Sequence, residues 1–409
     1  MTEKISGAHD DQGDDRGPGK AAGSEAPVIL SNKPGSFARG VLDRRHPALI
    51  RQVRDAFPYG PRQHRALDAL LDEITDGVVE PLDASDQDLE LWSVWGREHF
   101  GRSWFDVPFL WSESYFYRRL LAAIDYFGEG PWQGVDPFMP FKQAELRGAA
   151  VDEELRALDE LADAPAGERA TALLYASLWG NRADLGFRAS ADEPAPGDTD
   201  PNLVADDSAE LWSLLPAGAP ATVAVVADNA GRELIPDLVL TDHFLGHGHA
   251  ERVVLHVKPY PYYVSDATTA DVVDCLRRLA QAPGEPGRIG GRLWEAMRTG
   301  HLEVRTHPFF CAPLPYEEMP EDLRKEFAAA AVTILKGDLN YRRLVGDRLW
   351  EPTTSFADVT AYFPGPVAAL RTLKSDVVVG LEQRKVSTLE RSGQAWRTSG
   401  THALIQARR

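Results

Sequence analysis

Polar side chains that suit metal and phosphate chemistry follow three apolar runs in the second half of the chain, at the point where each run ends. The first run leads into Asp228 and Asn229, the second into a segment that closes with Asp266, and the third into residues 336–342. A buried strand does not need polar side chains of these types at its end in order to be stable. In parallel sheets, ligands bind just beyond the carboxyl ends of the strands. The three sets of side chains are therefore expected to converge on one site.

The chemistry that these side chains suit is the binding of a hard divalent cation and of phosphate. Two carboxylates and a carboxamide favour Mg²⁺ or Mn²⁺, with Co²⁺ or Ni²⁺ as further options, over the zinc that His and Cys prefer. Such a cation polarises a phosphoryl oxygen and activates water. Asp228 taken alone is equally well explained as a helix N-cap. With Asn229, Asp266 and a predicted loop at 337–342 added, a binding site is the better interpretation.

The elements that would position this site follow from the spacing of apolar residues. After residue 207, short apolar runs alternate with helical patterns, which is typical of βαβ units and a mainly parallel sheet covered on both faces. Before it, apolar residues recur at helical spacing. We therefore expect an α/β fold, with a mainly helical N-terminal domain at 27–207 and a three-layer α/β/α, Rossmann-like domain at 208–409. Residues 1–26, rich in Gly, Asp and Ser, are predicted to be a disordered tail.

The expected strands and helices are assigned from period and flanking residues. The strands are expected at 222–227, 252–257, 302–306 and 331–335. The helices are expected at 37–57, 61–74, 112–127, 151–162, 168–178, 233–245, 268–280 and 321–330.

Composition restricts the partners of the chain. Its 409 residues carry a net charge of −18, the wrong sign for general nucleic-acid binding. No stretch approaches the ~18 apolar residues of a membrane span, and two cysteines do not imply a disulfide framework. We therefore expect a cytoplasmic protein with no nucleic-acid or membrane partner. The oligomeric state is left open.

These motifs resemble the damage-control phosphatase family, formerly a domain of unknown function. One branch of that family has also been described as acidic-residue (protein-glutamate) methyltransferases. Arg371-Thr372-Leu373-Lys374 matches an Arg-Thr-x-Lys signature of that branch. Here Arg232 takes a position that is often aromatic in the family. The other matching segments run in the family's order, at 36–38, 43–47, 113–119, 178–185, 211–215, 228–234, 263–266, 336–344 and 346–348.

The resemblance implies roles for individual residues. The metal ligands would be Asp228, Asn229 and Asp266, and with Lys374 they would form the catalytic set. The substrate would be a small phosphorylated metabolite, most typically a sugar phosphate such as a fructose phosphate, or a nucleotide or sugar phosphate intermediate. Besides the catalytic set, the substrate would contact Asp338, Leu339, Asn340, Tyr341 and Arg342. Further cleft residues would be Glu113, Arg118, Asn181 and Asp184.

Three functions are compatible with these residues. In a metal-dependent phosphatase, the nucleophile would be either metal-bound water or Asp228 itself, which would form an aspartyl-phosphate. A methyltransferase that uses S-adenosylmethionine and modifies protein carboxylates is a second hypothesis, but 228–231 is a poor substitute for the Gly-rich turn that usually holds such a cofactor. A sugar-phosphate-binding protein without catalysis is the third.

Overall fold

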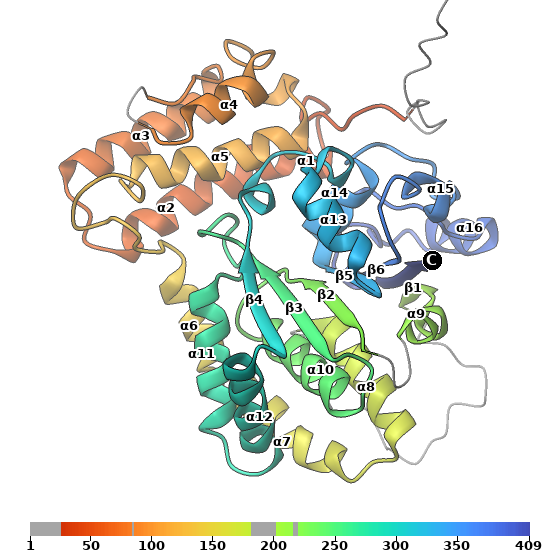
Figure 1. The fold of residues 1–409 in the computed structure, drawn as a ribbon. Helices are drawn as coiled ribbons and strands as arrows, with labels where there is room; N and C mark the ends of the chain where they lie inside the picture. Colours follow the sequence, from red (N-terminus) through yellow and green to blue (C-terminus); the bar gives the residue numbers. More distant parts are fainter. Residues whose placement is uncertain (1–25, 84–85, 181–201, 216–219) are drawn as a thin grey trace, which may run out of the picture.

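A seven-stranded sheet lies at the centre of the computed structural model, which describes residues 26–83, 86–180, 202–215 and 220–409 (Figure 1). The strand order is β1-β7-β6-β5-β2-β3-β4. All neighbours are parallel except β6 and β7. The strands are β1 (Leu203–Asp206), β2 (Thr222–Val226), β3 (Arg252–Val257), β4 (Leu302–Thr306), β5 (Val332–Lys336), β6 (Val367–Thr372) and β7 (Ala403–Arg408).

The order of the strands fixes where a ligand would bind. From β2 the chain continues outward through β3 and β4, and it then returns to the other side of β2 to form β5 and β6. The switch point, where these two directions of strand addition separate, lies between β2 and β5. In open α/β sheets, the crevice beyond the strand ends at such a switch point is the ligand-binding position. The residues that follow β2 and β5 therefore occupy the favoured place for chemistry.

Side chains of the central strands alternate between two hydrophobic cores, as the two-residue period of a strand requires. Val223 and Val225 of β2 belong to one core, and Ala224 and Val226 belong to the other. The helices of the first core are α7 (Ala149–Ala162), α8 (Ala166–Trp179), α9 (Ser208–Leu214), α10 (Leu234–Gly246), α11 (Thr269–Ala280) and α12 (Glu285–Thr299), with α6 (Met139–Leu146) at its edge.

The second core covers the opposite face of the sheet and continues into the N-terminal helices, which form a separate group beside the sheet (Figure 1). Its C-terminal helices are α13 (Glu321–Ala329), α14 (Gly337–Val345), α15 (Phe356–Val359) and α16 (Gln383–Arg391). Its N-terminal elements are α1 (Phe37–Gly40), the π-helical turn η1 (Val41–Arg45), α2 (His46–Ala56), α3 (Pro61–Asp76), α4 (Leu89–Gly96) and α5 (Phe109–Ala123).

The predicted α/β class and the mainly parallel sheet are confirmed, and all four expected strands are present. The predicted boundary at residue 207 is wrong, because β1 lies before it and α7 and α8 cover a face of the sheet. β1, β6 and β7 were not predicted. β1 has only four residues, the apolar run at the start of β6 is also only four residues long, and Gln406 interrupts the apolar run of β7. The single helix expected at 37–57 is interrupted by η1.

Two other features of the described residues bear on the sequence-based expectations. Cys275 and Cys311 are both free and buried. In the described part of the chain, no helix combines the length and the apolar character needed to cross a membrane.

The shared core predicts that the N-terminal helices and the sheet unfold together. Leu120 of α5 is fully buried in it. We expect Leu120→Ala to lower the free energy of unfolding by about 2–5 kcal/mol, the usual cost of such a cavity. Urea denaturation followed by tryptophan fluorescence and by far-ultraviolet circular dichroism should show both transitions moving together. Leu91→Ala is the matched control, because Leu91 is 50% exposed. If Leu120→Ala shifted the fluorescence transition but not the circular dichroism transition, a common core would be contradicted.

Candidate functional site

The ends of β2 and β3 are tied together at the three predicted metal ligands. Asn229 and Asp266 pair as an isolated antiparallel bridge. The Ala267 N–H donates to the Asp228 carbonyl oxygen at 2.9 Å, and the Ser265 hydroxyl donates to Asn229 Oδ1 at 2.7 Å. The structure therefore brings Asp228, Asn229 and Asp266 to one place.

Two buried carboxylates lie close together at this junction. Burial raises the pKa of Asp228 well above its ordinary value, and the charges of Glu233 and Asp266 raise it further. Burial also raises the pKa of Asp266. Among the described residues, Asp266 Oδ2 has no hydrogen-bond partner, and the Lys258 ammonium lies 3.8 Å from it. The pKa of each carboxyl is thus raised in spite of nearby cations, Lys258 and Lys374 for Asp228 and Lys258 and Lys142 for Asp266.

A buried lysine from the N-terminal half of the chain positions Asp266. Lys142 of α6 donates to the Asp266 carbonyl oxygen at 2.8 Å. It also binds Asp136 and Asp271, each at 3.0 Å. Sequence reasoning missed this residue, since a lone lysine on a helix gives no local signal of such a role.

Glu233 is a second residue that sequence reasoning did not assign to the site. Asn229 Nδ2 donates to Glu233 Oε2 at 2.8 Å and to Asp228 Oδ2 at 3.1 Å. The Lys374 ammonium lies 3.5 Å from the other oxygen of Glu233. Glu233 therefore links the β2 end to Lys374. Glu233 comes just before α10 and five residues after Asp228. This position in the sequence could have indicated that it belongs to the site.

Asp338 and Lys374 meet on the other side of the switch point. Asp338 Oδ1 accepts from the Lys374 backbone N–H at 3.0 Å, from Ser375 Oγ at 3.2 Å and from Arg371 Nε at 2.8 Å. Burial alone would raise the pKa of Asp338, but Arg371 and Arg342 hold it below its ordinary value. Glu233, Asp228 and Asp338 outweigh burial and raise the pKa of Lys374. At neutral pH, Asp338 is therefore a negatively charged carboxylate and Lys374 is a positively charged ammonium.

The segment 337–342 is the start of helix α14, and its prediction as a loop is wrong. The helix can begin so close to β5 because Gly337 adopts a φ of 84°, which L side chains rarely adopt. The Asp228 carboxylate packs against this glycine: an added Cβ would lie 1.9 Å from Asp228 Oδ2.

The residues after Asp338 have partners within the protein. Leu339 joins a small apolar cluster. Asn340 donates to the Ala227 carbonyl oxygen at 3.2 Å and so holds α14 against the end of β2. The Tyr341 hydroxyl donates to Gln406 on β7 at 2.9 Å. These contacts give the three side chains positioning roles.

Glu113 and Arg342 form a buried link between α5 and α14. Arg342 binds Glu113 at 2.7 Å and Asp347 through two of its nitrogens at 2.7 and 3.0 Å. The Tyr263 hydroxyl also donates to Glu113, at 3.3 Å. The predicted cleft residue Glu113 thus lies beside the segment that carries Asp266.

The structure does not bring Arg118 to this group. Its guanidinium binds Asp86 at 2.7 Å and Asp88 at 2.5 Å. None of its described contacts reaches Asp228, Asn229 or Asp266. Asn181 and Asp184 lie outside the described residues.

Comparison with known proteins identifies the family. A family model described as the damage-control phosphatase ARMT1-like domain matches residues 41–389. The chain belongs to this family. It is 31% identical to "Damage-control phosphatase ARMT1" of Danio rerio, over 95% of this chain and 98% of that protein. The human protein of the same name is 29% identical over 93% of this chain and 98% of its own length.

Among solved structures, a DUF89-family protein from Pyrococcus horikoshii is similar to this chain. The TM-score is 0.46 at 14% sequence identity, over 90% of this chain and 99% of the other. Membership in the damage-control phosphatase ARMT1-like family makes this chain a phosphatase.

The contact between Asp228 and Gly337 yields a test of the site. We expect Gly337→Ala to lower phosphatase activity by roughly 10²-fold, the cost of misplacing a site group by about 1 Å. Gly346→Ala is the matched control. Gly346 has the same φ of 84°, and its added Cβ would lie 3.7 Å from the Arg348 side chain. Both variants bear a backbone cost of about 1–2 kcal/mol. Equal activity in the two variants would exclude a role for this contact.

The buried carboxyl of Asp228 predicts how stability depends on pH in metal-free protein. The pKa of Asp228 in the folded state is raised above 3.8, its ordinary value in an unfolded chain. At pH values between 3.8 and the raised pKa, the folded state therefore binds more protons than the unfolded state. Stability therefore falls as pH rises through that window. In the presence of a chelator at pH ~7, we expect Asp228→Asn to unfold at a higher temperature than wild type. Calorimetry measures this, with the exposed Asp358→Asn as control. A lower melting temperature for Asp228→Asn would contradict the cost of burying this charge.

Proposed function

We propose that this phosphatase hydrolyses phosphate esters of small metabolites, sugar phosphates in particular, with a divalent cation bound by Asp228, Asn229 and Asp266. The observation that carries the proposal is the pair of buried carboxylates beyond β2 and β3. Among the described residues, Asp266 Oδ2 accepts no hydrogen bond, and the Lys258 ammonium lies 3.8 Å from it. Uncompensated buried charge is costly unless a cation is bound.

The donor set fits Mg²⁺ or Mn²⁺, which take oxygen ligands. Among the described residues, no three His, Cys, Asp or Glu side chains are grouped as metal ligands. A cation at this edge would therefore take its third protein oxygen from the Asn229 carboxamide. Such a cation, when bound, offsets charge on the phosphoryl oxygens and makes water a better nucleophile.

The other groups of the site would bind and orient the substrate. The Lys374 ammonium and the first-turn N–H groups of α14 would hold the non-bridging phosphate oxygens. Asp338 uses Oδ1 for its protein contacts, and no described residue donates to its Oδ2. In the proposed complex, that oxygen would accept a hydrogen bond from a sugar hydroxyl. Glu233, bonded to Asn229 and close to Lys374, would keep both side chains in position.

In the proposed reaction, water attacks phosphorus as the bond between phosphorus and the ester oxygen breaks. The proton released by water passes to a carboxylate of the site, for which Asp228 is the candidate. The leaving alkoxide takes up a proton, so the products are an alcohol and phosphate. Attack by Asp228 itself is the second route, and it would leave phosphate attached to the protein in an acid quench.

The test combines turnover with metal binding. We expect phosphate release from a panel of sugar phosphates and nucleotides with Mg²⁺, Mn²⁺, Co²⁺ or Ni²⁺. Asp266→Asn should lower kcat/KM by roughly 10²-fold or more. Mn²⁺ should raise the melting temperature of wild type and leave that of Asp266→Asn unchanged.

The exposed Asp358→Asn serves as the control and should behave as wild type. Full activity of Asp266→Asn would refute the metal assignment. Tight binding of S-adenosylmethionine without metal, in the absence of any phosphate release, would favour the methyltransferase hypothesis.

A further inference from the structure

Gly180 follows helix α8 and packs directly against the side chain of Glu233. A Cβ added to Gly180 would lie 2.7 Å from Glu233 Cγ and 3.3 Å from Glu233 Cβ. The positions of these two atoms follow from the backbone and one torsion angle, so they cannot move aside as the tip of a long side chain can. Gly180 also has a φ of 51°, which favours glycine. A glycine therefore lets α8 end this close to Glu233.

The carboxylate of Glu233 connects two side chains of the candidate site. Its Oε2 accepts a hydrogen bond from Asn229 Nδ2 at 2.8 Å, and its Oε1 lies 3.5 Å from the Lys374 ammonium. The first contact fixes which way the Asn229 carboxamide faces, because only its nitrogen can donate to a carboxylate. A displaced Glu233 would therefore disturb both the proposed metal ligand and the proposed phosphate-binding lysine.

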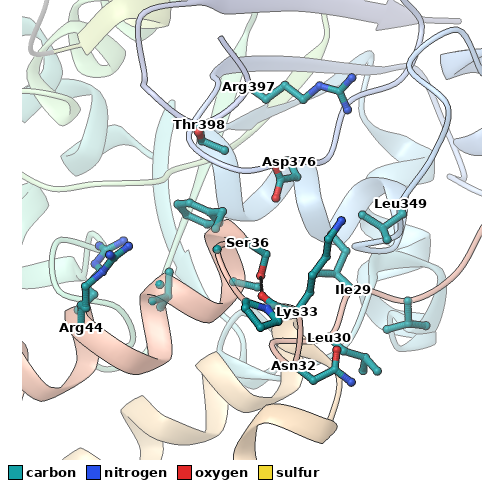
Figure 2. A pocket seen from close by; sticks show the side chains of 18 residues that line it. Ile29, Leu30, Asn32, Lys33, Ser36, Arg44, Leu349, Asp376, Arg397 and Thr398 are labelled. Carbon is teal, nitrogen blue, oxygen red and sulfur yellow. Dashed lines mark hydrogen bonds between the residues drawn. The ribbon is translucent and has the colours of Figure 1, made fainter. Parts of the chain in front are cut away.

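The chain near Lys374 borders open space. A cavity of about 950 Å³ lies between residues 28–45 and the C-terminal part of the chain, and Asp376 and Thr398 are on its wall (Figure 2). Asp376 follows Lys374 by two residues. The Lys374 side chain is itself 45% exposed. The direction of this side chain therefore depends on its contact with Glu233 more than on packing.

A buried polar group, the α8 anchor, holds the last turn of α8 and consists of Ser177, Lys336 and Asp237. The Ser177 carbonyl oxygen accepts from the Lys336 ammonium, and the Ser177 hydroxyl accepts from it at 2.6 Å. The same hydroxyl donates to Asp237 Oδ1 at 2.6 Å, and Lys336 lies 2.9 Å from that oxygen. Lys336 ends β5 and Asp237 lies on α10. The α8 anchor thus fixes α8 relative to a strand and a helix that border the site.

The α8 anchor is better explained by the arrangement it fixes than by stability. Removing two charges from water costs about as much free energy as their attraction contributes, so a buried ion pair adds little net stability. A shift of α8 against β5 or α10 would leave a buried charge without its partner, which is strongly unfavourable. The permitted arrangement places Gly180, three residues after Ser177, against Glu233.

We propose that Gly180 is a positioning residue of the active site, which holds the Glu233 carboxylate where it orients Asn229 and Lys374. The α8 anchor fixes Gly180 in turn. This inference rests on the proposed function, which assigns Asn229 to the metal and Lys374 to the phosphate. Gly180 takes no part in the chemistry and acts only through Glu233.

The test is a double-mutant cycle in the full-length enzyme, which compares Gly180→Ala, Glu233→Ala and the double variant with wild type. Gly180→Ala should weaken Mn²⁺ binding in calorimetry about tenfold or more, since partners that orient a metal ligand typically contribute about 10–100-fold. It should lower kcat/KM by a similar factor, measured with the phosphate ester that wild type hydrolyses fastest. In the Glu233→Ala background, the same substitution should change either quantity by less than about twofold, because the contact through which it acts is gone.

Gly248→Ala is the control for a side chain at positive φ. Gly248 has a φ of 70°, and no described atom lies within 4 Å of its Cβ position. This variant should bind Mn²⁺ as wild type does. A structural effect of Gly180→Ala that does not pass through Glu233 would lower Mn²⁺ affinity and kcat/KM by equal factors in both backgrounds.

Ser177→Ala is the second variant and decides the question if Gly180→Ala does not fold. It removes one hydroxyl from the α8 anchor and leaves the pair of Lys336 and Asp237 in place. We expect it to weaken Mn²⁺ binding about twofold or more, the usual size of effects passed along such a network. Thr171→Ala is its matched control, because it removes an exposed hydroxyl from the same helix. Equal Mn²⁺ affinity in the two variants would overturn the inference.

The outcomes separate this inference from the proposed function. Equal losses from Gly180→Ala in both backgrounds overturn the role of Gly180 and leave the proposed function in place. If wild type binds Mn²⁺ but hydrolyses no sugar phosphate, the proposed substrate class fails, and the metal-binding cycle still decides on Gly180. If wild type binds no metal, the proposed metal site is refuted, and the role of Gly180 is overturned with it.

Discussion

The burial of two carboxylates, Asp228 and Asp266, beyond adjacent parallel strands is the constraint on which the rest of the site depends. Like charges in a poorly solvated place repel one another, so the surrounding structure must hold them. Lys142 fixes the backbone at Asp266, Asn229 donates to Asp228, and Gly337 leaves the space that the Asp228 carboxylate fills. These contacts come from α6, the β2 end and α14, which explains why elements distant in sequence converge here.

The same constraint explains the arrangement of the second core. Glu113 of α5 and Arg342 of α14 are bonded out of contact with water, and Asp347 completes the group at a φ of 51° that non-glycine residues seldom adopt. Removing one partner from such a buried pair is strongly destabilising. The helices α1–α5 are therefore fastened to the sheet beside the site.

The amino-acid sequence was sufficient to predict the α/β class and the convergence of Asp228, Asn229 and Asp266, because each follows directly from strand period and strand ends. It was not sufficient for Lys142 or Glu233, whose roles depend on how helices pack in three dimensions. Arg118 was misplaced for the same reason: Asp86 and Asp88, which bind it, lie in a different part of the chain. The short apolar run of β6 and the polar Gln406 within β7 concealed two strands of the sheet.

The position of β7 has a consequence for the order in which the protein folds during synthesis. β7 lies between β1 and β6, so β1 gains its neighbour only after nearly the whole α/β part has left the ribosome. The backbone at Leu373 is held by His402 and Gly400, each at 2.8 Å. Lys374 therefore reaches its final position late. A nascent chain that already carries the Asp228 end of the sheet would lack an ordered phosphate-binding lysine, and its activity would begin only when translation of β7 is complete.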